Sequence, residues 1–151
     1  MAAQTPRQTM DSFVQYVKGE GILDDKFDNT RNLVRETYPE FALDIFKNYV
    51  RDADKLMREL AHHLKQPVVD YPKVDNITHR FKGASMSIGG CRVVTACLEL
   101  RDACDRKDKE RCLEAYQQVV TEYSTLRDKM KTICKMERAV IDDEAGGHSK
   151  K

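Results

Sequence analysis

Residues 74–90 read VDNITHRFKGASMSIGG, and the spacing of their apolar side chains decides how this part of the chain folds. At about 100° per residue, these side chains cluster within roughly 40° of one direction on a helical wheel. They are Val74, Ile77, Phe81, Ala84 and Ile88. His79 lies on the opposite side of the wheel. The pattern therefore predicts an amphipathic helix that buries its apolar stripe and exposes the imidazole of His79.

The residues beside His79 on this predicted helix suit a phosphoryl acceptor. A neutral imidazole nitrogen is nucleophilic near physiological pH, because the unperturbed pKa of imidazole is about 6.5. A phosphoryl group brings about two negative charges, which Lys82, one turn away, can offset as a mobile point charge. Gly83 costs a helix interior roughly 1 kcal/mol relative to alanine, and close approach of another protein would explain it. The alternative is an ordinary surface histidine beside a solvated lysine.

Asp75, Met86 and Arg101 are further candidates near His79. Asp75 and Met86 fall on the exposed side of the wheel, and Asp75 either fixes the imidazole tautomer or places a favourable charge in the first helical turn. Gly89-Gly90 predicts a turn. His79 lies nine residues before Ile88, and nine residues after Cys91 the returning helix reaches Leu100 and Arg101, which should stand roughly level with the imidazole. Arg101 is therefore a candidate to hold the phosphoryl group or to orient the ring. A surface ion pair with a nearby carboxylate is the alternative.

The run HRFKGASMSIGG resembles the signature of histidine-containing phosphotransfer (HPt) proteins, and especially that of the plant members of the cytokinin relay. The resemblance extends from about Phe13 to about Met136. The positions that match the family pattern are His79, Lys82, Gly83, Ser85, Ser87, Ile88 and Gly89. The positions that depart from the usual residues are Arg80, Ala84, Met86 and Gly90, and they bear on partner preference. One branch of the family lacks the histidine, and the presence of His79 argues against membership of that branch.

The resemblance implies that His79 takes a phosphoryl group from an aspartyl phosphate on the receiver domain of a hybrid sensor kinase. It then passes the group to an aspartate of a response regulator. The receiver domains are the implied partners, and they supply the magnesium and the acidic pocket, so no cofactor or metal is expected on this chain. The implied protein is a monomeric phosphocarrier of the cytoplasm and nucleus. The supporting site candidates are Arg101, Arg80, Ser85, Asp75 and Met86.

Composition fits a small helical carrier. The 151 residues allow one domain, and 40% hydrophobic with 34% charged residues suits long amphipathic helices. A net charge of +1 gives no reason to expect nucleic acid or a membrane as a partner. Residues 1–10 contain no apolar stretch, and the sequence has no run of about 18 apolar residues, so neither secretion nor membrane insertion is expected. The five cysteines lack Cys-x-x-Cys spacing and are expected to be reduced core residues. His62 and His63 diverge by about 100° on one helix and cannot chelate one ion.

The sequence predicts an all-α fold, an antiparallel up-down-up-down four-helix bundle at about residues 39–136. Two short helices at about residues 11–37 precede it as a cap, the first starting at Asp11 or Ser12 and the second ending near Thr37. A single domain is expected over residues 1–138, with a disordered tail over 139–151. The apolar stripe of the first bundle helix is predicted to include Phe41, Ile45 and Val50. The stripe of the last bundle helix is predicted to include Leu113, Tyr116, Val120 and Tyr123.

Three classes of function fit these patterns to different degrees. The first is a phosphorelay carrier, and the second is a helical interaction module that titrates receiver domains without carrying phosphate. The third is an autonomous kinase or phosphatase. No glycine-rich phosphate loop, Walker sequence or clustered acidic metal site supports the third class. His79 favours the first class over the second.

Overall fold

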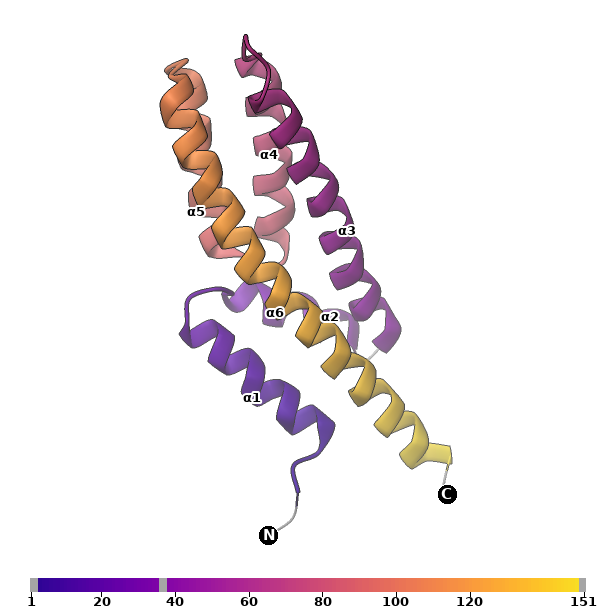
Figure 1. Cartoon of the computed structure of the whole chain (residues 1–151). Helices are drawn as coiled ribbons and strands as arrows, with labels where there is room; N and C mark the ends of the chain where they lie inside the picture. The colour runs from indigo at the N-terminus through magenta and orange to yellow at the C-terminus, as the bar shows by residue number, and fades with distance from the viewer. Residues whose placement is uncertain (1–2, 36–37, 150–151) are drawn as a thin grey trace.

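The structure is a computed structural model that describes residues 3–35 and 38–149, and these residues form helices and no strand. The helices are α1 (Pro6–Gly19), α2 (Asp25–Arg35), α3 (Pro39–Leu64), α4 (Tyr71–Ser87), α5 (Cys91–Asp105) and α6 (Lys109–Ser149). Short connections make α3, α4, α5 and the first part of α6 antiparallel neighbours, which pack as a bundle (Figure 1). The predicted all-α bundle with two short N-terminal helices is confirmed.

The first helix begins earlier than the sequence predicts. The Thr5 hydroxyl accepts a hydrogen bond from the Gln8 amide at 3.1 Å, and the Gln8 side chain accepts one from the Thr5 amide at 3.0 Å. This reciprocal pair is a capping box, which satisfies two amides that a helix start leaves free. Pro6 occupies the first turn, where a missing amide costs nothing. The expected start at Asp11 or Ser12 is therefore wrong.

The chain is helical through Ser149, where the sequence predicts a disordered tail from residue 139. The reason is α1, which lies against the C-terminal part of α6 (Figure 1). Val140 is only 2% exposed, and Arg7 Nε lies 2.8 Å from Glu144 Oε1. Because α1 packs against this part of α6, the helix continues where the sequence alone offered no partner. The predicted disordered tail is therefore wrong for the described residues. The expected end of the second helix near Thr37 lies outside the described residues.

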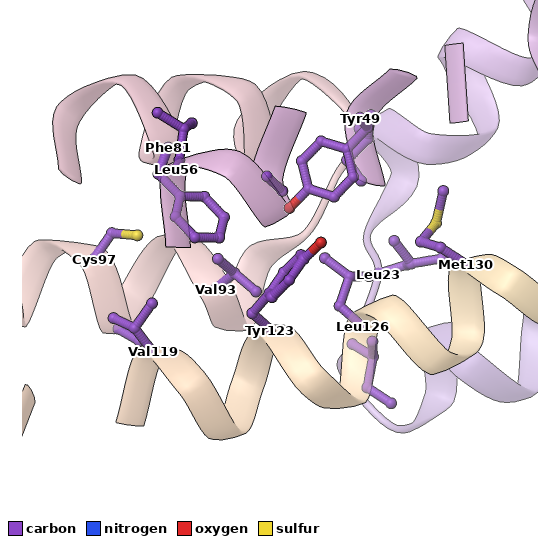
Figure 2. Packing of buried hydrophobic residues seen from close by; sticks show 14 of the residues in the cluster. Leu23, Tyr49, Leu56, Phe81, Val93, Cys97, Val119, Tyr123, Leu126 and Met130 are labelled. Carbon is purple, nitrogen blue, oxygen red and sulfur yellow. The ribbon is translucent and has the colours of Figure 1, made fainter. Parts of the chain in front are cut away.

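The centre of the bundle is built on three aromatic rings from α3, α4 and α6 (Figure 2). The ring centroids of Phe81 and Tyr123 lie 5.4 Å apart, and those of Tyr49 and Tyr123 lie 6.4 Å apart, both in edge-to-face geometry. The Tyr49 hydroxyl lies 2.8 Å from the Ser85 hydroxyl, and the Tyr123 hydroxyl donates to Asp54 Oδ1 at 2.6 Å. The buried hydroxyls thus have partners, which burial requires.

Parts of two predicted stripes are wrong by about one residue. Towards its start, α3 buries Ala42, Phe46 and Tyr49, while Phe41 is 51% exposed. Likewise, α6 buries Cys112 and Val119 in place of Leu113 and Val120. Where two adjacent residues are both apolar, the sequence pattern does not show which of them is buried. The helix that packs against this segment determines which one faces the core. On α3 that neighbour is α2, whose Phe27 ring stacks on Phe46 at 5.0 Å.

The cysteines are all free thiols. Cys97, Cys104 and Cys112 are buried, and Cys104 Sγ lies 3.9 Å from Cys112 Sγ. Burial raises the pKa of Cys97 to about 12, which keeps its thiol protonated at neutral pH. Among the helices of the described residues, none is both long and apolar enough to cross a membrane.

Candidate functional site

The two ends of α4 are held by specific local contacts. At its start, the Asp70 carboxylate accepts a hydrogen bond from the Lys73 amide at 3.1 Å. At its end, Gly89 has a φ of +80°, which glycine adopts without strain. A Cβ atom there would lie 2.5 Å from Asp24 Oδ1 and 2.8 Å from the Phe27 amide nitrogen. Glycine is required because the turn packs directly on the backbone that opens α2.

Between these ends, α4 turns the imidazole of His79 to the surface. Val74, Ile77 and Phe81 are fully buried, and His79 on the opposite side is exposed. The predicted orientation of the helix is therefore confirmed. Ser85 departs from the predicted site, because it is fully buried and contacts Tyr49 in the core. Ser85 holds α4 against α3, and its side chain is not part of the surface around the imidazole.

Asp75, Arg101 and His79 form one connected chain of polar contacts on α4 and α5. Arg101 Nε donates to Asp75 Oδ1 at 2.9 Å, and Arg101 Nη2 donates to Asp75 Oδ2 at 3.5 Å. Arg101 Nη1 lies 3.0 Å from Nδ1 of His79. The Asp75 carboxylate raises the pKa of Arg101, which fixes the guanidinium as a cation. Arg101 therefore stands level with the imidazole as predicted, and it makes the ring contact and the carboxylate pair together.

Lys82 and Gly83 border the imidazole one turn further along α4. Lys82 is half-buried, and its ammonium has no hydrogen-bond or ion-pair partner among the described residues. Gly83 is exposed, and a Cβ atom added to it would meet no atom within 4 Å. The glycine therefore leaves open space beside His79 and fills no packing need within the bundle.

Met86 lies on the face that carries His79, whereas Arg80 is directed away from it. Met86 is 39% exposed on the face that carries His79. Arg80 Nη2 donates to Glu59 Oε2 at 3.1 Å, so this guanidinium is directed to α3. Of the supporting candidates, the structure thus brings Arg101 to the imidazole and Asp75 to Arg101, keeps Met86 on the same face, and places Arg80 and Ser85 elsewhere.

Helix α2 extends the surface around His79 in a way that the sequence analysis missed. Thr30 Oγ1 donates to the carbonyl of Ser87 at 3.2 Å, which ties α2 to the end of α4. A shallow depression of about 320 Å³ lies between the two helices. Its lining residues are Lys26, Asn29, Thr30, Met86 and Ser87. The sequence contained one indication of this contact, which is the glycine at position 89. A glycine at a turn allows another segment to approach the backbone closely.

Comparison with known proteins identifies the family. The model of the Hpt domain family matches residues 44–130, more than half of the chain. This chain belongs to the Hpt domain family. Histidine-containing phosphotransfer protein 1 of Arabidopsis thaliana is 35% identical to this Hpt chain over 137 residues, which are 89% of each protein. The crystal structure of a histidine-containing phosphotransfer protein from maize superposes with a TM-score of 0.84 at 30% identity, covering 90% of this chain and 99% of the maize chain.

The Hpt family also includes relatives whose names mark them as pseudo forms. Pseudo histidine-containing phosphotransfer protein 1 of rice is 28% identical over 113 residues, which are 75% of this chain and 60% of the rice protein. The predicted resemblance to plant HPt proteins is confirmed by these comparisons.

Proposed function

We propose that this Hpt protein is a phosphorelay intermediate and that His79 is its phosphoacceptor. The observation that carries the proposal is the exposed imidazole on α4, with the ammonium of Lys82 and the open space at Gly83 beside it. The donor is an aspartyl phosphate on the receiver domain of a hybrid sensor kinase. The acceptor is an aspartate of a response regulator.

The proposed transfer requires few chemical groups from this chain. The lone pair of an imidazole nitrogen attacks phosphorus, and the new N–P bond forms as the P–O bond to the receiver aspartate breaks. The electron pair of that bond stays on the aspartate as a carboxylate. Lys82 offsets charge on the phosphoryl oxygens, and the receiver supplies Mg²⁺ and the acidic pocket. Passing the group to the second receiver reverses these steps.

The receiver is proposed to dock over His79 and the depression between α2 and α4. Gly83 lets the partner approach the imidazole, and exposed Met86 offers an adaptable apolar contact. Leu33 on α2 is 79% exposed and adds apolar area outside the bundle. By its likeness to plant HPt proteins, we place the chain as a monomeric carrier in a cytokinin-type relay of the cytoplasm and nucleus.

The alternative is a helical module that binds receiver domains without carrying phosphate, as the pseudo relatives suggest. The deciding experiment incubates the chain with a phosphorylated receiver domain and Mg²⁺, then assays acid-labile phosphate on the chain. We expect label on the native chain and none on His79→Gln. An unlabelled native chain that still binds the receiver would establish the alternative.

A further inference from the structure

The contact between Arg101 and His79 defines where the imidazole proton lies. A guanidinium only donates hydrogen bonds and cannot lose a proton in a protein. At 3.0 Å from Arg101 Nη1, Nδ1 of His79 must therefore be the acceptor, and a neutral ring must carry its proton on Nε2. Nε2 has no hydrogen-bond partner within residues 3–35 and 38–149, so it is the nitrogen that a receiver can reach.

This protonation pattern is the wrong one for attack on phosphorus. A neutral imidazole attacks through the nitrogen that holds the lone pair, and with Arg101 in place Nε2 holds the proton. We propose that Arg101, anchored on Asp75, is a latch that keeps Nδ1 unprotonated and thereby lowers the reactivity of His79 until a receiver docks. The inference rests on the proposed phosphoacceptor role of His79 and adds a positioning residue to it. Opening the latch frees Nδ1 to take the proton, which leaves the lone pair on Nε2.

The same contact protects the phosphorylated ring. Once Nε2 carries the phosphoryl group, the ring releases the Nδ1 proton to water, and the neutral ring again has its lone pair on Nδ1, where Arg101 can donate. In hydrolysis, water attacks phosphorus, the N–P bond breaks, and its electron pair returns to Nε2. The leaving imidazole is neutral only if Nδ1 has first gained a proton. A guanidinium on Nδ1 opposes that protonation, so the latch slows spontaneous loss of phosphate as well as premature attack.

Asp75 is what makes the latch reversible. Both carboxylate oxygens of Asp75 face the guanidinium, and the two side chains are 30% and 32% exposed. When Arg101 leaves the ring, these two hydrogen bonds keep the cation from being left without a partner. Bidentate pairs of this kind also restrict the orientation of the guanidinium. A receiver that competes only for Nη1 can therefore open the latch without breaking the ion pair.

The first test measures the tautomer without any partner. Imidazole ¹⁵N chemical shifts, recorded at about pH 8 to keep well above the ordinary pKa of imidazole, distinguish protonated from unprotonated Nδ1. We expect unprotonated Nδ1 in the native chain, and in Arg80→Gln, whose guanidinium contacts Glu59 instead. In Arg101→Gln, the ¹⁵N shift of Nδ1, averaged over the two tautomers, should move towards the value of a protonated nitrogen. A protonated Nδ1 in the native chain, or no change in Arg101→Gln, would overturn the latch.

The second test follows the phosphorylated chain alone. Phosphoramidate, a small phosphodonor, would phosphorylate the histidine, and ³¹P NMR would record loss of the signal after the donor is removed. An exposed charge-assisted hydrogen bond supports a rate change of about three- to tenfold. We expect hydrolysis to accelerate by that factor in Arg101→Gln, to stay native in Arg80→Gln, and to lie closer to native in Arg101→Lys, which keeps a cationic donor. Equal rates for native and Arg101→Gln would refute the protective role.

These outcomes separate the latch from the proposed function. Neither measurement uses a receiver domain. If receivers fail to label His79 while both tests succeed, the relay role is wrong and the latch stands as a property of the ring. If receivers label His79 while both tests fail, the relay role stands and Arg101 acts only as a structural ion pair.

Discussion

Gly83→Leu separates the needs of the partner from the needs of the bundle. Gly83 is exposed in the interior of α4, and outside its chain neighbours and its own helical backbone no atom lies within 4 Å of the position that a Cβ would take. A leucine should therefore cause no clash, and its better helix propensity should stabilise the fold by about 0.7 kcal/mol. For a chain of this length, that corresponds to a rise in Tm of about 2 °C.

Transfer should change in the opposite direction. The leucine side chain would stand one turn from His79, in the space that the receiver is proposed to fill. A displacement of about 1 Å between reacting groups costs on the order of 100-fold in rate. We therefore expect transfer from a phosphorylated receiver to fall by about two orders of magnitude while the melting curve holds or improves.

Gly19→Leu is the matched control, because Gly19 also lies in a helix with open space around it but on α1. It should leave transfer unchanged. A large fall in the Tm of Gly83→Leu would mean that the glycine packs against another part of the protein. Native transfer with native stability would remove the steric role of Gly83 altogether.

Three further substitutions test other parts of the site. His79→Gln should change the free energy of unfolding by less than about 0.5 kcal/mol, because the imidazole is exposed; a thermal melt checks this, and unfolding would contradict the exposed placement. Lys82→Ala should slow transfer and shorten the lifetime of the phosphorylated form without abolishing either; time courses at low salt that match the native chain would exclude Lys82 from the site. Gly89→Ala should destabilise the fold by about 1–3 kcal/mol, since φ is +80° and the new Cβ would meet Asp24 Oδ1 at 2.5 Å; chemical denaturation measures the loss, and a stability equal to native would show that the turn can rearrange freely.

The sequence predicted the parts of the site that depend on one helix or one short turn. The outward direction of His79 follows from the spacing of Val74, Ile77 and Phe81 alone, because a single helical period relates them. The position of Arg101 beside His79 follows from counting residues across a tight turn, because a short turn leaves α4 and α5 little freedom to slide along each other. What sequence could not show is that Arg101 contacts the ring and Asp75 together, since side-chain direction depends on both helices.

The sequence predictions that proved wrong share a different cause, which is packing between segments that are distant in the chain. The burial of Ser85 depends on Tyr49, which lies 36 residues earlier in the chain. The direction of Arg80 depends on Glu59 of α3. The helical state of residues 139–149 depends on α1 at the opposite end of the chain. No local pattern contains these contacts, so tertiary packing overrode the local expectation in each case.

The length of α6 has a practical consequence for hydrodynamic measurements. Its 41 residues, at about 1.5 Å per residue, span roughly 60 Å. A compact sphere of this chain length would be only about 38 Å across. An elongated particle elutes earlier from a gel-filtration column than a sphere of equal mass, so calibration with globular standards will overestimate the mass of a single chain. Light scattering, which measures mass without assuming a shape, is needed to distinguish one long molecule from a pair.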